Sequence, residues 1–498
     1  MAKARAFLAF DMGAESGRAI VGSFDGARIE LQEVHRFSND PVRIGNTLYW
    51  DILRLFYEIK RGLAAALRQY GRSICSLGID TWGVDFGLLD KSGQLLSNPV
   101  HYRDSRTDGM VEEAFKIMPR SEIFRHTGIQ IMQINTLYQL LAMKKSNSPL
   151  LEIADRLLCI PGLLSYFLTG VQSSDSTAAS TSQLYDPVAR SWSDPVLQAF
   201  EIPRSILPEI VDAGTVVGEL LPEVRQETGA SDGLKVVTPG GHDTACAVAA
   251  VPAQSKDYIF LSCGTWSLMG IETDSPVIND LTADFNFTNE GGVCNTIRLL
   301  KNIAGLWPVQ ECRRAWEREG VHLSYDEITV AASSAPELRS FIDPDDRAFL
   351  NPEYMPGAIQ EFCKKTKQPV PQSRGEIVRA ALEGLALKYR FVADRLETIA
   401  GRRLETIHMV GGGIRNRLLC QMAANATKRR VVTGPSEATA VGNTLMQAMA
   451  MGEINTLEEL REVVRNSFET EVFEPADSSV WDEAYARFVE MLEAQQGA

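Results

Sequence analysis

Apolar and polar positions at the start of the chain alternate in short runs, as they do in strands joined by tight turns. The pattern predicts three strands, a helix and a fourth strand, over residues 6–10, 19–24, 28–37, 51–70 and 74–80. Asp51 has the position of a helix N-cap, and Gly71 follows the end of that helix. On this helix we expect one apolar face, made of Leu53, Phe56, Leu63 and Leu67.

A second hairpin of the same kind begins after the midpoint of the chain. Residues 258–270 read as a buried strand, a turn rich in Gly, Ser and Thr, and a return strand. Gly264 lies 251 residues after Gly13, and Ser267 lies 251 residues after Ser16. A chance similarity of two hairpins is the alternative to an internal repeat, and the hairpins alone do not decide between them.

The rest of the chain gives fewer signals. Residues 100–235 have a mostly helical pattern, a strong amphipathic helix is predicted over 376–400, and a helical tail over 481–493 is expected to pack on the body of the protein. The succession of strand, glycine-rich turn and helix is predicted three times, in residues 236–250, 407–416 and 431–440.

A glycine-opened helix near the midpoint carries the most concentrated polar chemistry. Gly240 and Gly241 allow a tight backbone, His242, Asp243 and Thr244 follow, and small apolar residues then predict a closely packed helix. Asp243 has two interpretations: a carboxylate that caps the helix, or a catalytic base between the two halves of the chain. Capping is the commoner use of such a residue, so the context has to decide.

Length and charge limit the class of protein. A chain of 498 residues is expected to form two domains. The net charge of −14 disfavours nucleic acid or an anionic membrane as a main partner. Eight scattered cysteines without a CxxC pair are interpreted as reduced core thiols. Residues 1–5 contain no targeting signal and no run of 18 apolar residues occurs, so we expect a cytoplasmic protein.

The commonest nucleotide-binding motifs are missing from the sequence. There is no G-x-x-x-x-G-K-[ST] loop, no G-x-G-x-x-G after a strand, and no protein-kinase signature around His101-Tyr102-Arg103-Asp104. The two hairpin turns remain, and the N–H groups of such turns form anion-binding concavities that suit phosphates. Asp11, at the end of the first strand, would then reach a Mg²⁺ carried by those phosphates, usually through water.

Several segments together resemble the FGGY carbohydrate kinases of the sugar-kinase, actin and heat-shock ATPase superfamily. They run in family order from residue 7 to about 450, and they are residues 10–18, 78–86, 102–107, 135–140, 242–244, 262–270, 300–303, 305–307 and 410–413. The segments Ile79–Phe86 and Gly264–Gly270 resemble most closely the branch of the family that acts on L-rhamnulose.

The resemblance implies a role for each matched residue. Asp243 matches the general base that takes the proton of the sugar hydroxyl, which attacks the γ-phosphorus of ATP in line. The ATP-binding residues implied are Gly13, Ala14, Glu15, Ser16, Gly17 and Arg18 in the first phosphate loop, Gly264 and Thr265 in the second, and Gln310, Gly411 and Gly412 near the adenine nucleotide. The sugar contacts implied are Gly83, His242, Thr244 and Asn302, and we expect Trp82 and Asp85 to shape the same pocket.

Some of these positions leave alternatives open. Glu15 stands where related kinases often have a small hydroxyl residue, and it either points to solvent or helps to hold Mg²⁺. Cys263 replaces a Ser in the second phosphate loop, a small change if the backbone makes the contact. Trp82 is equally well interpreted as an ordinary core aromatic residue.

The resemblance implies an α/β fold of two ribonuclease-H-like (actin-like ATPase) domains, residues 1–245 and 246–498, with the active site in the cleft between them. The expected reaction is the ATP- and Mg²⁺-dependent phosphorylation of the 1-hydroxyl of L-rhamnulose by a monomer or homodimer whose partners are the ketose and ATP. One alternative is a kinase for another ketose, such as L-fuculose or a xylulose-like sugar. An alternative of a different class is an actin-like ATP-driven switch without a sugar acceptor.

Overall fold

The computed structural model describes residues 5–476 and 478–496, and the chain divides into two compact units. The first unit contains Met1–Gln254, Glu272–Leu299 and Glu437–Phe468, and the second contains Ser255–Ile271, Leu300–Ser436 and Glu469–Ala498. The predicted domain boundary divides the chain once, after residue 245, whereas each of these units consists of three segments. That boundary stays a prediction. Residues 1–4, on which the expectation about targeting partly rests, lie outside the described residues.

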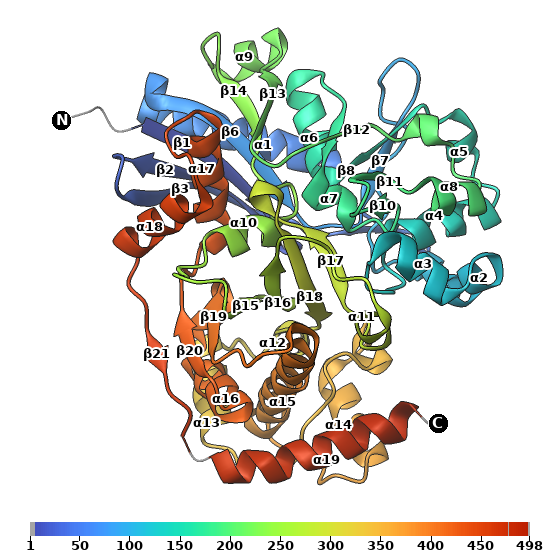
Figure 1. Cartoon of the computed structure of the whole chain (residues 1–498), viewed down its shortest axis with the longest axis vertical. Helices are drawn as coiled ribbons and strands as arrows, with labels where there is room; N and C mark the ends of the chain where they lie inside the picture. The colour runs from blue at the N-terminus through green and yellow to red at the C-terminus, as the bar shows by residue number, and fades with distance from the viewer. Residues whose placement is uncertain (1–4, 477, 497–498) are drawn as a thin grey trace. The chain divides into compact units, whose positions relative to one another are not determined.

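The first unit is built on a six-stranded sheet in the order β13-β14-β6-β1-β2-β3 (Figure 1). Its strands are β1 (Arg5–Met12), β2 (Ser16–Phe24), β3 (Ile29–Ser38), β6 (Ile74–Thr81), β13 (Thr215–Glu219) and β14 (Lys235–Thr238). β1 is antiparallel to β2, β2 is antiparallel to β3, and β6 is parallel to both β1 and β14. The predicted hairpins and fourth strand are therefore confirmed.

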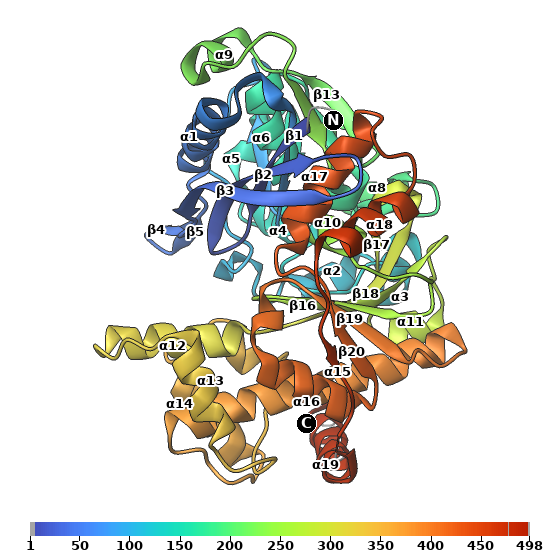
Figure 2. The same ribbon diagram turned by 90° about the vertical axis from the view of Figure 1, so that its left-hand side faces the viewer.

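Two helices pack on opposite faces of this sheet. α1 (Ile52–Tyr70) contacts β2 and β3, and α17 (Ala438–Ala450) contacts β1 and β6. Figure 2 shows the sheet between them. α17 comes from near the end of the sequence, so it completes a set of layers that the N-terminal strands and α1 begin.

The predicted ends of α1 are confirmed, but its predicted buried face is partly wrong. The Asp51 carboxylate accepts a hydrogen bond from the N–H of Arg54, and the N–H of Gly71 closes the helix end. Leu53 is 61% exposed. The buried positions are Ile52, Leu55, Glu58, Ile59, Gly62, Leu63 and Ala66. They recur every three or four residues, and Leu53 lies one position, about 100° of helix rotation, away from that stripe.

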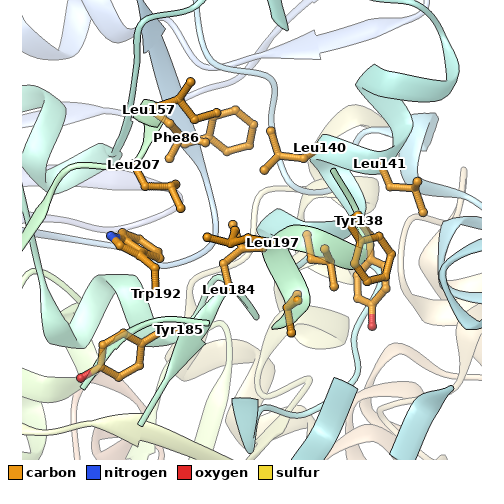
Figure 3. Packing of buried hydrophobic residues seen from close by; sticks show 14 of the residues in the cluster. Phe86, Tyr138, Leu140, Leu141, Leu157, Leu184, Tyr185, Trp192, Leu197 and Leu207 are labelled. Atoms are coloured by element: carbon orange, nitrogen blue, oxygen red, sulfur yellow. The ribbon is translucent and has the colours of Figure 1, made fainter. Parts of the chain in front are cut away.

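Residues 100–235 belong to the first unit and have more residues in helices than in strands, but fewer than half are helical, so the predicted mostly helical pattern is only partly confirmed. Their helices are α2 (Met110–Ile117), α3 (Arg120–Thr127), α4 (Thr136–Lys145), α5 (Pro149–Ile153), α6 (Ile160–Thr169), α7 (Ser176–Ser180), α8 (Asp194–Ala199) and α9 (Pro222–Thr228). Buried side chains from this region form a large apolar core with Phe86, which includes Tyr138, Leu157, Trp192 and Leu197 (Figure 3).

Short strands complete the first unit. They are β4 (Val42–Ile44), β5 (Thr47–Tyr49), β7 (Phe86–Leu89), β8 (Arg156–Cys159), β9 (Ser173–Asp175), β10 (Tyr185–Asp186), β11 (Ser191–Trp192), β12 (Glu209–Val211) and β17 (Thr288–Gly291). The helices α10 (Asp243–Ala249), α11 (Asp280–Asp284) and α18 (Leu457–Ser467) also belong to it.

The second unit repeats the hairpin of the first. Its sheet includes strands in the order β18-β16-β15-β19-β20-β21, with β15 (Ile259–Cys263), β16 (Ser267–Thr273), β18 (Ile297–Ile303), β19 (Thr406–Val410), β20 (Arg430–Thr433) and β21 (Val472–Phe473). The offset between Gly13 and Gly264 also separates the end of β1 from the end of β15, and the start of β2 from the start of β16. β15 is antiparallel to β16 and parallel to β19, as β1 is to β2 and β6. The predicted repeat of hairpins is confirmed.

The helices of the second unit include the long predicted one. They are α12 (Trp307–Arg318), α13 (Tyr325–Ser333), α14 (Met355–Lys365), α15 (Arg374–Ala400), α16 (Arg417–Thr427) and α19 (Ser478–Gln496). Ser373 and Glu376 form a capping box at the start of α15, and Gly401 in the left-handed region ends it. α19 contacts α15 and α16, as expected for the tail.

The structure also bears on the expectations about the burial of the cysteines and about membrane-spanning segments. All eight cysteines are free, and six are buried. Cys294 is exposed and Cys75 is half-buried, so the expectation of core thiols is wrong for these two. Within residues 5–476 and 478–496, no helix is both long and apolar enough to span a membrane.

Candidate active site

Three carboxylates lie where parallel strands of the first unit end. Asp11 and Asp80 are paired in the register of β1 and β6. β14 leads into α10, which begins at Asp243, and the N–H of Thr81 donates to the carbonyl of Gly241 at 2.8 Å. Because parallel strands end at one edge of a sheet, three distant stretches of sequence deliver their acidic side chains there.

Electrostatics confirm that these carboxylates interact. Burial raises the pKa of Asp11, the nearby charge of Asp243 adds to the increase, and Arg18 opposes it. Burial also raises the pKa of Asp80 well above its usual value, and the charge of Asp11 adds to it. Oδ1 of Asp80 is buried and has no hydrogen-bond partner among the described residues. The edge therefore concentrates negative charge that favours a cation or a proton.

Arg18 already balances part of this charge. Its guanidinium donates to the carboxylates of Asp11 and Glu437. Burial lowers the pKa of Arg18, but the charges of Asp11 and Glu437 outweigh that effect and raise it above its ordinary value. Arg18 is thus a permanent cation, held beside the first phosphate loop by one acid from each end of the sequence.

The first predicted phosphate loop is a tight turn between β1 and β2. The N–H of Gly13 donates to the carbonyl of Ser16 at 3.0 Å, and the side chain of Asn39 donates to the carbonyl of Gly13 at 2.8 Å. A Cβ at Gly17 would lie 2.2 Å from the ring of Phe37, so only glycine fits there. Ala14 and Glu15 between them are half-buried. Oε1 of Glu15 is buried, so the interpretation in which this side chain points to solvent is not supported, and the interpretation in which it helps to hold Mg²⁺ stays a prediction.

Asp243 occupies the first turn of α10, and His242 is the N-cap residue, whose side chain makes no capping hydrogen bond. Oδ1 of Asp243 accepts a hydrogen bond from Oγ1 of Thr244 at 3.1 Å and lies 3.5 Å from Nε2 of His242. The Asp243 side chain is 31% exposed. A carboxylate that is held on one side and open on the other is suited to accept a proton from a ligand.

The backbone before Asp243 is fixed by buried side chains. Oδ1 of Asp175 accepts from the N–H of Gly241 at 3.0 Å, and Oγ1 of Thr177 accepts from the N–H of His242 at 3.0 Å. These two bonds hold the turn that aims His242 and Asp243.

On the predicted sugar side, Asp85 is a buried acceptor for four donors. Its Oδ2 accepts from the indole N–H groups of Trp50 at 2.6 Å and Trp82 at 3.0 Å, and from the backbone N–H of Tyr102 at 3.2 Å. Its Oδ1 accepts from the amide of Gln139 at 2.9 Å. Burial raises the pKa of Asp85 to about 6, against the hydrogen bonds that lower it. Asp85 therefore orients Trp82.

Trp82 is itself almost fully buried. Its ring centroid lies 4.0 Å from that of Trp50, which stacks on His101 in turn. Both interpretations of Trp82, core residue and wall of a sugar pocket, fit this position.

The residues between Trp82 and Asp85 adopt a strained turn. Val84 has φ of 67°, rare for a β-branched residue, and the N–H of Asp85 donates to the carbonyl of Gly83 at 2.9 Å. Oγ1 of Thr181 accepts from the N–H of Val84 at 2.9 Å, and Oγ1 of Thr136 donates to its carbonyl at 2.6 Å. Backbone strain of this kind is typical of ligand sites.

The second predicted phosphate loop lies in the second unit, between β15 and β16. The N–H groups of Leu306 and Trp307 donate to the carbonyls of Gly264 and Thr265 at 2.9 and 3.2 Å. α12 therefore starts directly on the loop. Gln310 is in the first turns of α12, and its Oε1 is buried without a hydrogen-bond partner among the described residues. An unsatisfied buried amide oxygen is an available acceptor for a ligand.

The glycine-rich turn after β19 and the end of β18 hold the remaining predicted residues. Gly411 has φ of 87°, and Gly413 packs so closely on Cys263 that a Cβ would lie 2.2 Å from its Sγ. A Cβ at Gly412 would meet nothing within 4 Å, so the space beside it is open. Asn302 is half-buried near the end of β18.

Four buried or half-buried charged residues were not assigned a role from the sequence. They are Asp80, Glu290, Arg298 and Glu437. Asp80 had a usable signal, because it ends a predicted strand like Asp11. The other three had none, because they reach the site only through contacts between segments far apart in the sequence.

The donor set fits a cation that arrives with ATP. Among the described residues, no group of three or more His, Cys, Asp or Glu side chains could hold a metal ion. Mg²⁺ prefers oxygen ligands and usually keeps several waters together with substrate phosphates. The Asp11 carboxylate would supply one such oxygen donor to a Mg²⁺ that arrives with phosphates.

Comparisons with known proteins agree on one family. The model of the N-terminal domain of the FGGY family of carbohydrate kinases matches residues 6–250, and the model of the C-terminal domain matches residues 259–451. A rhamnulokinase of Bacteroides thetaiotaomicron is 45% identical over 97% of this chain and 98% of its own length. A rhamnulokinase of Oceanobacillus iheyensis is 39% identical over 93% of this chain and 97% of its own.

A solved structure shares the fold. The ligand-bound xylulose kinase of Lactobacillus acidophilus aligns with a TM-score of 0.81 and 17% identity over 99% of both chains. The two-domain α/β architecture predicted from the sequence is thereby confirmed.

Proposed function

We propose that this chain, which belongs to the FGGY family of carbohydrate kinases, phosphorylates the 1-hydroxyl of L-rhamnulose with Mg-ATP to give L-rhamnulose 1-phosphate. The observation that carries the proposal is Asp243, a half-buried carboxylate on a fixed backbone beside His242 and Thr244. Relatives named rhamnulokinase, matched over nearly their whole length, support the choice of sugar.

The base assignment follows from the geometry of Asp243. Thr244 donates to Oδ1 and His242 lies beside the same oxygen, which leaves Oδ2 as the atom that accepts the proton of the 1-hydroxyl. An aspartate is a weak base, but phosphoryl transfer has a loose transition state in which the proton leaves late. The enzyme then contributes mainly by holding the hydroxyl in line with the γ-phosphorus.

The nucleotide is assigned to the two hairpin turns and the glycine-rich turn. The N–H groups of Gly13 and Gly264 are bonded to the carbonyls of Ser16 and Trp266, so the other residues of these two turns would offer their N–H groups to phosphates. Gln310 would offer an acceptor and Gly412 open space for the adenine nucleotide. Mg²⁺, when bound, neutralises phosphate charge during transfer. The cleft between the domains and a cytoplasmic location stay predictions.

The choice of ketose is tested with a substrate panel. Purified protein is assayed with Mg-ATP and L-rhamnulose, L-fuculose or D-xylulose, and kcat/KM is measured for each. We expect the highest value for L-rhamnulose. A clearly higher value for another ketose would move the assignment to that sugar and leave the kinase chemistry intact.

The base is tested with Asp243→Asn, which keeps the size of the side chain and removes its basicity. We expect kcat for ketose phosphorylation to fall by at least about 100-fold, as it does when a general base is lost. Binding of Mg-ATP, measured by calorimetry, should be retained. Near-normal turnover would exclude Asp243 as the base, and ATP hydrolysis unaffected by any ketose would favour the actin-like switch.

A further inference from the structure

A buried ion pair lies directly behind His242. Glu290 is in β17 and Arg298 is in β18, and both side chains are almost completely buried. A nitrogen of the Arg298 guanidinium lies 3.2 Å from Oε2 of Glu290 and 3.1 Å from Nδ1 of His242. Oε2 of Glu290 also lies 3.2 Å from the same Nδ1. The division between the units falls within β18, after Leu299, so His242, Glu290 and Arg298 all belong to the first unit.

The charges around the imidazole select one tautomer. A guanidinium only donates hydrogen bonds, so its contact with Nδ1 requires a lone pair on that nitrogen. The proton of the neutral ring is then on Nε2, which faces the carboxylate of Asp243 at 3.5 Å. Glu290 by itself would favour a proton on Nδ1, but the cation at 3.1 Å and the anion beyond Nε2 both favour the other arrangement.

This orientation affects the oxygen of Asp243 that receives the proton. With its proton on Nε2, 3.5 Å from Oδ1, the His242 ring presents its positive edge to the same oxygen that accepts the Thr244 hydrogen bond. Oδ2 is left to the sugar hydroxyl. A neutral His242 ring protonated on Nδ1 would place the lone pair of Nε2 against Oδ1, and a ring turned over would place Cε1 there, so either change would disturb this division.

The ion pair is poorly explained as a device for stability alone. Burying two charges costs more than their attraction returns unless every hydrogen bond is satisfied. Nη1 of Arg298 is buried and has no hydrogen-bond partner among the described residues. Arg298 is anchored instead by the carbonyl of Gly291, to which its Nε donates at 2.9 Å, and that bond directs the guanidinium at His242.

We propose that Glu290 and Arg298 are positioning residues that hold His242 with its Nε2–H towards Asp243, and so leave Oδ2 of Asp243 as the proton acceptor. Arg298 sets the tautomer and Glu290 keeps Arg298 in place. The inference rests on the proposed function of Asp243, but not on the identity of the ketose.

The test is a double-mutant cycle with the full chain. The pair variant Glu290→Gln/Arg298→Gln removes both charges together, so it leaves no single buried charge. It is combined with His242→Asn, and kcat, KM for the best ketose of the panel and KM for ATP are measured for all four proteins. We expect the pair variant to lower kcat/KM for the ketose about 10- to 100-fold when His242 is present. In the His242→Asn background the same change should cost less than about threefold, because the residues act through His242.

A matched buried pair serves as the control. Arg379 and Glu383 form an equally buried ion pair on α15 of the second unit. Arg379→Gln/Glu383→Gln should lower the melting temperature but leave KM for the ketose within about twofold. Equal losses of kcat/KM in both His242 backgrounds would overturn the inference and make the Glu290–Arg298 pair structural.

A second variant covers the case in which the charge-free pair does not fold. Glu290→Asp keeps the charge and withdraws the carboxylate by one methylene from Arg298. Glu290→Asp should lower kcat/KM for the ketose when His242 is present and much less in the His242→Asn background. Equal losses of kcat/KM in both backgrounds would again overturn the inference. Asp243→Asn is assayed in parallel: if that variant retains turnover, the base assignment is wrong, which is a result distinct from additivity in the cycle.

Discussion

Among single residues, Asp85 gathers donors from four segments of the chain, and one of those donors is the indole of Trp82. Its burial outweighs these hydrogen bonds, so its pKa is raised from 3.8 to about 6. The protein therefore binds the Asp85 proton more tightly when folded than when unfolded. The stability that this proton contributes is complete below about pH 4 and is lost as the pH rises through about 6.

Asp85→Asn should remove this pH dependence. We expect the free energy of unfolding of the parent, minus that of the variant, to fall by up to about 3 kcal/mol between pH 4 and pH 7. Urea unfolding of both proteins at several pH values measures the difference. Asp232→Asn is the control, because its side chain is 94% exposed. A difference between the parent and Asp85→Asn that stays constant with pH would contradict the assignment.

At the scale of elements, the position of Asp243 depends on how α10 packs against α17. A Cβ at Gly442 in α17 would lie 1.8 Å from the carbonyl oxygen of Cys246 in α10. The two helix backbones are therefore as close as they can be. α17 also contacts the sheet, because the side-chain amide of Gln447 donates to the carbonyl of Leu8 in β1 at 3.0 Å. The same helix therefore packs against both the sheet and α10, which carries the proposed base.

Gly442→Ala should separate α10 from α17. The added methyl group would collide with a backbone carbonyl, which cannot turn away as a side chain can. We therefore expect a loss of about 3 kcal/mol in the free energy of unfolding and, because α10 moves, a fall in kcat. Thermal melting and ketose kinetics measure the two effects. Gly357→Ala is the matched helix control, because its Cβ meets only the exposed ring of Tyr354 at 3.0 Å. A Gly442→Ala protein with the stability and kcat of the parent would show that the crossing can relax.

At the scale of the whole molecule, the predicted substrate-binding residues are distributed between the two units. The base and the predicted sugar residues Gly83 and His242 belong to the first unit, and Gln310 and Gly412 belong to the second. Two predicted sets depart from this distribution: Asn302, a predicted sugar contact, is in the second unit, and the first predicted phosphate loop, Gly13–Arg18, is in the first. We therefore expect the adenine end of the nucleotide to depend on the second unit and the ketose mainly on the first, while the predicted phosphate contacts come from both.

Gln310→Ala tests that division. The change removes one acceptor for the nucleotide, so KM for ATP should rise about 3- to 10-fold, the value of one hydrogen bond, while KM for the ketose stays unchanged. His242→Asn should do the reverse. Steady-state kinetics with each substrate varied in turn give both constants. A rise in KM for the ketose with Gln310→Ala would contradict the separation.

The order of elements and the two phosphate turns could be predicted because their signals are local. Turn glycines, apolar runs and the capping residues of α1 and α15 act within a few positions of one another. Asp11 and Asp243 were found as candidates for the same reason, since each follows a predicted strand. Their roles came from the resemblance to a family, and the structure adds how their neighbours hold them.

The buried face of α1 shows where local signals end. More than one stripe of apolar residues could have formed the buried side of that helix. Packing against β2 and β3 selects the stripe that contains Leu55 and Ile59 and leaves Leu53 exposed. A sequence pattern states that a helix has an apolar side, whereas the partner surface decides which side is covered.

Local signals predicted the first strands and α1, the repeated hairpin, the long helix α15 and the acid that begins α10. The tertiary structure was needed to place Arg18 on Glu437, α17 on β1 and β6, and Glu290 and Arg298 against His242. The reason is physical. Backbone geometry depends on neighbours in the chain, but a buried charge is placed by partners far away along it, and such pairs leave no periodic trace in the sequence.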